Sequence, residues 1–360
     1  MSKKVLVIGA GAWGTALANH LSKLSCSVTI WGRDLDVIKQ INEEGVNNKY
    51  LPTLNLERGL LATSSLYDNF ISSEYIVFAL PSAASPIVVK ELSDQVKKNN
   101  HQVNNKLIIN VSKGFAFNNS CLNDSSSSSL GRDLSQSENN FSTSDYSYMT
   151  ELLKNNFSAE VGVLSGPGFA KELVQGRYTA VTIAAEKEEI SQKISELFHG
   201  ANLRTYSSVD LVGVELGGIL KNIIAIAIGI VDGAELGDNA RAALLTRSLV
   251  ELRRFIKAFG GLEDTVFGLS GLGDLYLTST SDSSRNRRFG VRLGRGEDLD
   301  IILKEIGTVE GARNAMIAAK LAESKNIEIP IISTVSMIIS KEISVDQACK
   351  RLFFRERKRE

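Results

Sequence analysis

Two lysines and one carboxylate are the side chains of this sequence whose types and surroundings could carry out acid–base chemistry. Lys221 lies within ELGGILKNIIAIAIGIVDG, residues 215–233, which is the most apolar run in the chain. Desolvation disfavours a buried ammonium group. We therefore expect the pKa of Lys221 to fall from about 10.4 toward neutrality, where proton exchange with an alcohol oxygen is efficient. The alternative is a lysine at the edge of the helix whose amine reaches the surface, and periodicity alone does not decide between the two.

The residues around Lys221 predict how it is used. Helical side chains lean toward the N-terminal turn, where Gly217 and Gly218 have no side chains, so we expect a small substrate or a nicotinamide ring to fill that space. Asp274 lies in a glycine-rich turn, and Thr278 follows four residues later. A carboxylate beside the lysine would orient it and tune its protonation.

Lys113 and a basic run are further candidates, for binding an anionic ligand. Lys113 follows the apolar run KLIINVS, and open α/β sheets bind ligands beyond the carboxyl ends of their strands. The run SRNRR begins with Ser284, Arg285 and Asn286, and arginine and asparagine can hold a phosphate. Taken alone, such a run is more typical of a solvated face. Beside an acid–base lysine, we interpret it as a phosphate site.

A glycine-rich turn near the N-terminus predicts a dinucleotide site. In VLVIGAGAWGTALANHL, Gly9, Gly11 and Gly14 have the G-x-G-x-x-G spacing between an expected strand and an expected helix. Gly9 allows the tight turn, Gly11 lets the backbone approach a pyrophosphate, and Gly14 lets the helix pack closely on the strand. A tight turn that binds no ligand is the alternative.

The end of the second expected strand bears on the choice of cofactor. A carboxylate about 20 residues after the glycines would bind a ribose 2′-hydroxyl and favour NAD. The sequence here is TIWGRD, with Arg33 at that place and Asp34 next to it. The donors of an arginine match the oxygens of a 2′-phosphate, so NADP(H) is favoured and NAD(H) is the alternative. Arg33 as a solvated surface charge also remains open.

The hydrophobic pattern predicts two domains that position these residues. Residues 1–207 alternate short apolar runs with helical patterns, which is typical of a Rossmann-type α/β domain with a parallel sheet covered on both faces. Residues 208–360 contain long helical patterns, 291–307 among them, and predict an all-helical substrate-binding domain. The Ser- and Asn-rich segment at about 118–148 is interpreted as a low-complexity surface insertion; a regulatory or partner-binding loop is the other reading.

Composition excludes several function classes. Lys and Arg together number 41, as do Asp and Glu, so no overall field attracts nucleic acid or an anionic membrane. Cys26, Cys121 and Cys349 have no metal-ligand spacing and no evident disulfide framework, which favours a reducing, cytoplasmic location. The apolar core 223–231 is shorter than the roughly 20 residues that span a bilayer, and the start MSKKVLVIGAGAWG is interpreted as a strand and turn, not a signal peptide.

The sequence resembles the NAD(P)-dependent glycerol-3-phosphate dehydrogenases of the bacterial soluble type. The resemblance rests on VIGAGAWGTALA, VSKG, LSGPGFAKE, ELGGILKNIIAIAIGIVDG, NARAALLTR, GLGDLYLT and SRNRRFG. These motifs follow in order from about Lys3 to past Gly311 and cover nearly the whole chain. The resemblance implies reversible reduction of dihydroxyacetone phosphate to sn-glycerol 3-phosphate, the backbone precursor of phospholipids, by hydride transfer at C2.

The resemblance also implies roles for single residues. Lys221 would be the catalytic acid and base, with Lys113 and Asp274 beside it. The substrate would be held by Lys113, Gly166, Gly168, Asn222, Asp274, Thr278, Ser284, Arg285 and Asn286. The cofactor would be held by Gly9, Gly11, Ala12, Trp13, Gly14, Arg33, Lys113, Ala170, Arg285, Val309 and Glu310. No metal is implied, a homodimer is compatible with the class, and the active site is expected between the two domains.

Two departures from the family pattern are visible, and two other functions stay open. The Ser- and Asn-rich insertion has no counterpart, and TVEGAR is one residue shorter than the common form, which weakens the assignment of Val309. A hydroxy-acid dehydrogenase with a helical second domain would need a carboxylate clamp in place of Lys113 and the Ser-Arg-Asn run. A dinucleotide-binding redox sensor would lack Lys221 or Asp274, and both are present.

Overall fold

The computed structural model describes residues 2–117 and 142–353. By its internal contacts the described chain forms two compact units, which divide within helix α8 (Leu211–Gly233), between Glu215 and Leu216. The predicted insertion at about 118–148 falls mostly outside the described residues. Its described end forms the short helical turn η4 (Thr143–Asp145) and the short strand β7 (Tyr146–Ser147).

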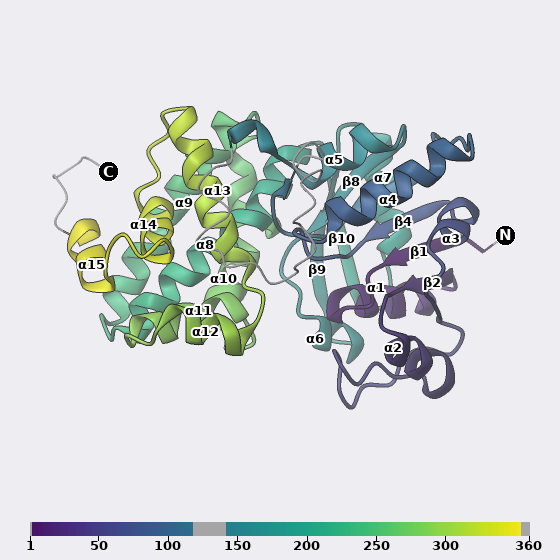
Figure 1. Ribbon diagram of the computed structural model, residues 1–360, viewed down its shortest axis with the longest axis horizontal. Coiled ribbons are helices and arrows are strands. Elements are labelled where there is room, and N and C mark those ends of the chain that lie inside the picture. The colour runs from purple at the N-terminus through teal and green to yellow at the C-terminus, as the bar shows by residue number, and fades with distance from the viewer. Residues whose placement is uncertain (1, 118–141, 354–360) are drawn as a thin grey trace. The chain divides into compact units, whose positions relative to one another are not determined.

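The first unit is an α/β layer structure built on one eight-stranded sheet (Figure 1). The sheet strands are β1 (Lys4–Ile8), β2 (Ser27–Trp31), β3 (Leu61–Thr63), β4 (Tyr75–Phe78), β5 (Leu107–Asn110), β8 (Glu160–Ser165), β9 (Thr179–Ala185) and β10 (Leu203–Ser208). The connecting helices are α1 (Ala12–Lys23), α2 (Leu35–Lys39), η1 (Gln40–Glu44), α3 (Tyr67–Ser72), α4 (Ser85–Lys98), α5 (Met149–Asn156), α6 (Ala170–Val174) and α7 (Glu188–Phe198). The short strand β6 (Ala116–Phe117) precedes the undescribed segment.

The sheet has the order β10-β9-β8-β5-β4-β1-β2-β3, and most of its pairs are parallel, as predicted. The exception is β8 with β9, which pair antiparallel, so β9 and β10 run opposite to the other six strands. The predicted parallel sheet therefore covers six strands, and the two strands at this edge run in the other direction. Buried strands have the same apolar pattern in either direction, so the sequence could not show the reversal.

Successive side chains of each strand point to opposite faces of the sheet, so two hydrophobic cores form, one on each face. In β1, Val5 and Val7 pack with the inward faces of α1 and α7, whereas Leu6 and Ile8 pack with residues of α3, α4 and α5. The same alternation continues in β4. Because both faces are covered, these strands are apolar throughout, and the turns at their ends remain the places for polar chemistry.

The second unit is helical, and no strand lies between residues 216 and 353 of the described chain. Its helices after α8 are α9 (Asp238–Ala258), η5 (Glu263–Phe267), η6 (Leu269–Gly273), α10 (Asp274–Thr280), α11 (Arg285–Gly294), α12 (Leu299–Ile306), α13 (Glu310–Ser324), α14 (Pro330–Ile339) and α15 (Val345–Phe353). The α/β part followed by an all-helical part confirms the predicted fold class.

Two details of the helical unit differ from the prediction. The pattern over 291–307 is two helices, because Gly296 has a φ of +81° and Asp298 caps α12 by accepting from the backbone N–H groups of two following residues. Helix α8 is long and apolar enough to cross a bilayer by length and composition, unlike the shorter core expected over 223–231. Its apolar window is completely buried within the structure, as in the core helix of a globular domain.

Candidate active site

The glycine-rich turn between β1 and α1 contains two glycines that the backbone packing requires and one that it does not. Gly9 has a φ of +124°, and a Cβ there would lie 2.6 Å from the carbonyl oxygen of Ala79. A Cβ at Gly14 would lie 2.0 Å from the carbonyl oxygen of Gly9. A Cβ at Gly11 would meet no described atom within 4 Å. Backbone packing therefore explains Gly9 and Gly14 but not Gly11, where the fold leaves open the space that a ligand could approach.

The first turn of α1 is suited to an anion. Gly11 is the N-cap residue and makes no side-chain capping bond, and the first turn, which begins with Ala12 and Trp13, contains no acidic residue. The N–H groups of a helix N-terminus lack partners within the helix, and the helix dipole adds positive potential there. The residues present thus fit a pyrophosphate.

A buried asparagine that the sequence analysis missed supports this turn. Asn47 is fully buried, and its Nδ2 donates to the carbonyl oxygen of Ala10 at 3.0 Å and to Oγ1 of Thr15 at 2.8 Å. It thereby ties the turn to the first helix. Its position 37 residues away in the chain gave no local signal of this role.

Trp13, Gly168 and Ala170 lie around the same turn. A Cβ at Gly168 would lie 2.7 Å from Cη2 of Trp13, so glycine at 168 leaves room for the indole. Ala170 begins α6, which packs against α1. The structure therefore brings these three predicted residues together, and it gives Gly168 a packing role besides the predicted ligand role.

The end of β2 presents an arginine whose neighbouring carboxylate is already engaged. Arg33 is exposed, and its guanidinium carbon lies 5.9 Å from the centre of the Trp31 ring. Asp34 accepts from the Lys49 ammonium at 2.7 Å and also caps α2. Its hydrogen bond with Lys49, with help from the capping N–H groups, lowers the pKa of Asp34. This carboxylate is therefore ionised and already bonded, which leaves Arg33 as the side chain of this strand end that is available to a cofactor.

Lys113 is held on the loop that follows β5. The strand ends at Asn110, and the half-buried Lys113 donates from Nζ to the carbonyl oxygen of Gly166 at 3.1 Å. Gly166 follows β8, which pairs with β5 in parallel. The predicted Lys113 and Gly166 thus meet at the carboxyl ends of two neighbouring strands, where the sequence placed a ligand site.

In the second unit, Lys221 is buried and contacts both of its predicted partners. Its side chain is 7% exposed and that of Asp274 is 2% exposed, and Lys221 Nζ lies 2.9 Å from Asp274 Oδ1. Nζ also donates to Thr278 Oγ1 at 2.6 Å, and that hydroxyl lies 3.2 Å from Asp274 Oδ1. The alternative of an amine that reaches the surface is therefore wrong. The arrangement fixes one amine at the junction of α8 and α10, with two oxygens to orient it.

The expected space beside Lys221 is not present at Gly217. A Cβ there would lie 2.9 Å from the carbonyl oxygen of Ser270, because the π-helical turn η6 packs directly on α8. The glycine-rich stretch before Asp274 is helical, not an open turn, and Asp274 is the first residue of α10. Gly217 therefore allows two backbones to approach each other and leaves no room for a ligand.

Asn222 connects Lys221's helix to two further elements. Its Oδ1 accepts from Nδ2 of Asn286 at 2.9 Å, and Asn286 Oδ1 accepts from the backbone N–H of Gly311 at 3.0 Å. Val309, the buried N-cap residue of α13, and Glu310, its first helical residue, come just before Gly311. Asn222 of α8 and Asn286 of α11 are therefore hydrogen-bonded in a chain to the backbone of α13, next to the predicted Val309 and Glu310.

Most of the basic run at the start of α11 is bonded within the protein, and Arg285 is the exception. The Ser284 hydroxyl caps α11 by accepting from the backbone N–H of Arg287 at 3.2 Å. Arg287 pairs with Asp232 at 2.8 Å, and Arg288 donates to the carbonyl oxygen of Asp282 at 2.5 Å. Arg285 is exposed and forms no hydrogen bond or ion pair with the described residues. Of the predicted phosphate ligands, Arg285 is thus the one with a charge to offer.

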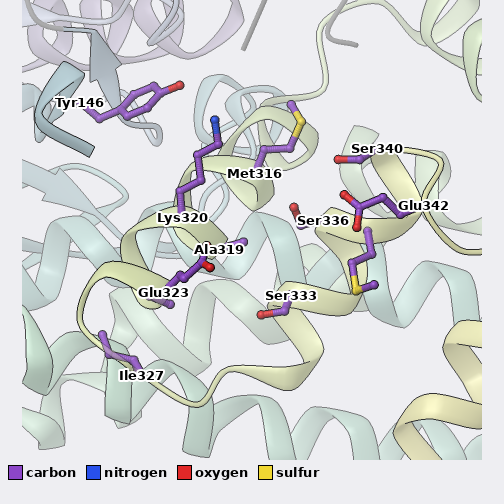
Figure 2. Close-up of a pocket in the computed structure, with 12 residues that line it drawn as sticks. Tyr146, Met316, Ala319, Lys320, Glu323, Ile327, Ser333, Ser336, Ser340 and Glu342 are labelled. Atoms are coloured by element: carbon purple, nitrogen blue, oxygen red, sulfur yellow. The ribbon is translucent and has the colours of Figure 1, made fainter. Parts of the chain in front are cut away.

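A cavity of about 440 Å³ lies elsewhere in the helical unit, between α13 and α14 (Figure 2). Its polar lining includes Lys320 and Glu323 from α13, and Ser333, Ser336 and Ser340 from α14 or its end. None of the predicted site residues is among the residues that line it. Over the same described part of the chain, no group of three His, Cys, Asp or Glu residues could hold a metal ion.

The sequence matches the models of one enzyme family over both parts of the chain. Residues 4–191 match the model for the N-terminus of NAD-dependent glycerol-3-phosphate dehydrogenase, and residues 210–350 match the model for its C-terminus. A glycerol-3-phosphate dehydrogenase [NAD(P)+] of Thioalkalivibrio sulfidiphilus is 38% identical over 99% of this chain and 98% of its own length. That of Agrobacterium fabrum is 39% identical over 98% of each chain.

A solved structure extends the agreement to three dimensions. The crystal structure of glycerol-3-phosphate dehydrogenase from Coxiella burnetii superposes with a TM-score of 0.84 at 34% identity, over 98% of this chain and 99% of that one. The matched models cover both units, and the relatives match over their full length. The chain belongs to the NAD(P)-dependent glycerol-3-phosphate dehydrogenase family.

Proposed function

We propose that this chain catalyses the reversible reduction of dihydroxyacetone phosphate to sn-glycerol 3-phosphate with a nicotinamide cofactor. The observation that carries the proposal is the buried Lys221, held between Asp274 and Thr278 in a chain of this family. Residues 1–207 would form the dinucleotide-binding domain, and residues 208–360 the substrate-binding and catalytic domain.

The proposed chemistry divides hydride and proton between two sources. When bound, a nicotinamide would supply the hydride that C2 gains in reduction and would take it up in the reverse direction. Lys221 gives its Nζ proton to the oxygen on C2 as that oxygen gains charge, and takes the proton back from the alcohol in reverse. Asp274 and Thr278 hold the amine in one orientation by accepting hydrogen bonds from Nζ. The protein thus supplies one proton at one fixed atom.

The remaining polar residues are assigned to binding. Lys113 would contact both cofactor and substrate, with Gly166, Gly168, Asn222 and Thr278 around the substrate. Arg285 would hold the substrate phosphate together with Ser284 and Asn286; the Ser284 hydroxyl also caps their helix, and Asn286 also donates to Asn222. The cofactor would contact Gly9, Gly11, Ala12, Trp13, Gly14, Arg33, Lys113, Ala170, Arg285, Val309 and Glu310.

The direct test is turnover by the purified wild-type chain. Oxidation of NADPH, followed by its absorbance, should require dihydroxyacetone phosphate and should yield sn-glycerol 3-phosphate, identified by chromatography. A folded chain that binds NADPH but turns over no dihydroxyacetone phosphate would overturn the substrate assignment. Hydroxy acids would then be tested next.

We infer that NADP(H) is preferred, with Arg33 contacting the 2′-phosphate. Arg33→Ala should weaken NADPH binding by roughly 10–100-fold, because a hydrogen bond to a charged group contributes about 1.5–3 kcal/mol. NADH binding should change little, since NADH has no 2′-phosphate. Fluorescence titration with each cofactor measures both values. Arg58→Ala, at another exposed arginine of the same unit, is the control. Equal losses for the two cofactors would contradict the assignment.

A second expectation is that Arg285, unlike the arginines that follow it, binds the substrate phosphate. Arg285→Ala should raise the KM for dihydroxyacetone phosphate by roughly 10–100-fold, from the loss of one charge-assisted contact. With NADPH at saturation, so that any cofactor contact of Arg285 is compensated, the kcat/KM for unphosphorylated dihydroxyacetone should stay unchanged. Arg288→Ala removes an equally exposed charge that is bonded to a backbone carbonyl, and should leave both values near wild type. Similar losses with both substrates would show that Arg285 does not read the phosphate.

The cellular role follows from the proposed product. sn-Glycerol 3-phosphate is the backbone precursor of phospholipids, so we propose a role in lipid biosynthesis in the cytoplasm. A homodimer would be compatible with this role, and sedimentation of the purified chain would determine the oligomeric state.

A further inference from the structure

A buried carboxylate outside the predicted set, Glu215, is bonded to the strand end that leads into the Lys113 loop. Glu215 is 2% exposed, and its Oε1 accepts from Nδ2 of Asn110 at 3.1 Å and from the backbone N–H of Thr150 at 3.2 Å. Its Oε2 accepts from the Thr150 hydroxyl. All of these residues belong to the first unit. No role in the proposed reaction has been assigned to any of them so far.

Asn110 connects Glu215 to the loop by hydrogen bonds. It is the last residue of β5 and is fully buried. Its Oδ1 accepts from the backbone N–H of Ser112 at 2.9 Å, and its Nδ2 donates to the carbonyl oxygen of Ser112 at 3.2 Å as well as to Glu215. One amide side chain therefore binds both main-chain polar groups of the residue next to Lys113.

The orientation of this amide is determined by its partners. If the oxygen and nitrogen of Asn110 were exchanged, the oxygen would face two acceptors, the Glu215 carboxylate and the Ser112 carbonyl. The nitrogen would face the Ser112 N–H donor. A carboxylate at position 215 thus stabilises the one orientation in which the loop is held. The Ser112 hydroxyl adds a second anchor, since it donates to the carbonyl oxygen of Leu80 at 2.6 Å.

The carboxylate is energetically costly at this place. Burial raises the pKa of Glu215 to about 7, while hydrogen bonds from Thr150, Met149 and Asn110 act in the opposite direction. An apolar side chain of similar volume would avoid this desolvation. Stability alone therefore does not account for Glu215, whereas the position of the Lys113 loop does.

We propose that Glu215 is a positioning residue for Lys113, acting through Asn110 and the backbone of Ser112. The proposal rests on the proposed function, in which Lys113 contacts cofactor and substrate. Lys113 reaches the carbonyl oxygen of Gly166 from one side, and the Glu215–Asn110 pair fixes the loop from the other. The backbone next to Lys113 is then held at both of its polar groups, which restricts where the amine can point.

The test compares two replacements of Glu215. Glu215→Met removes the acceptor and keeps an unbranched side chain, and should lower kcat/KM for dihydroxyacetone phosphate by about 10²-fold, as small misplacements near reacting groups do. Glu215→Gln can still accept from Asn110 through its amide oxygen and should recover most of the activity. Thr150→Val is the matched control: it removes the hydroxyl bond to the other oxygen and leaves the Asn110 contact in place.

A double-mutant cycle separates positioning from a general structural effect. In a Lys113→Ala background, Glu215→Met should cause little further loss of kcat/KM, because the side chain it positions is gone. An equal loss in both backgrounds would overturn the proposal. So would wild-type kinetics in the Glu215→Met chain.

A second readout does not depend on the substrate. Amide hydrogen exchange in peptides that span residues 110–114 should be faster in Glu215→Met and close to wild type in Glu215→Gln and Thr150→Val. Unchanged exchange in Glu215→Met would overturn the proposal even if activity fell. Faster exchange in a chain whose wild type reduces no dihydroxyacetone phosphate would instead refute the proposed function and leave the positioning intact.

Discussion

Lys221→Met should lower kcat for dihydroxyacetone phosphate reduction by ~10²–10⁴-fold or more, the usual effect of removing a catalytic proton donor. NADPH affinity should stay near that of wild type, because the glycine-rich turn belongs to the first unit and Lys221 to the second. Methionine is unbranched like lysine but carries no proton to exchange. Steady-state turnover and fluorescence titration of NADPH measure the two effects on the same preparation.

The single variant leaves a buried carboxylate without its counter-charge, so a second variant is needed. Asp274 is 2% exposed, and removing one partner of a buried ion pair costs roughly 3–5 kcal/mol. The double variant Lys221→Met with Asp274→Asn contains no buried charge at this pair and should melt nearer to wild type while remaining inactive. If that folded double variant retains wild-type turnover, Lys221 is not the acid and base. Inactivity of the single variant alone would not decide the matter.

The sequence predicted this pair by residue type, not by distance. A lysine inside the most apolar helix needs a polar partner, and a carboxylate followed by a hydroxyl one helical turn later was a suitable one. Lys221 and Asp274 are 53 positions apart, and the segment that separates them contains no signal that brings them together. The prediction for Gly217 was wrong for a related reason. A glycine without a side chain is explained equally by a ligand and by a second backbone, and only the packing of η6 on α8 decides.

The fold could be predicted wherever a local pattern determined it. The strand over residues 27–31 and the helices that begin near residues 12, 211 and 238 follow directly from apolar spacing. The break between α11 and α12 was missed, although Gly296 and Asp298 are residue types typical of a helix end and a helix start. The antiparallel pairing of β8 and β9 could not be predicted, because strand direction depends on the path of the chain and not on composition.

The positioning residues were the hardest to predict. Asn47 and Asn110 are buried amides whose partners are mostly backbone groups, and any buried amide needs such partners. Whether the loop it binds carries a catalytic side chain is a property of the fold. This is why the sequence indicated candidate ligand-binding residues and missed the buried amides that bond to the backbone around them.

Two glycine variants should separate the requirements of the fold from those of the cofactor. Gly11→Ala should weaken NADPH binding by at least ~10-fold, equivalent to about 1.4 kcal/mol, because its methyl group would occupy the space that a pyrophosphate approaches. Its melting temperature should fall only slightly, since the methyl group meets no described atom and alanine for glycine at an N-cap costs at most about 1 kcal/mol. Calorimetry and cofactor titration give both quantities.

Gly14→Ala should show the opposite order of effects. Its Cβ would lie 2.0 Å from the Gly9 carbonyl oxygen, so α1 has to move away from the turn, and overpacking of this kind costs about 1–3 kcal/mol. The loss of stability should be measurable without any cofactor present, and weaker NADPH binding should follow from the displaced helix. If Gly11→Ala binds NADPH like wild type, the turn holds no pyrophosphate at that place. The open space at Gly11 would then need another explanation, because the backbone packing that requires Gly9 and Gly14 does not extend to it.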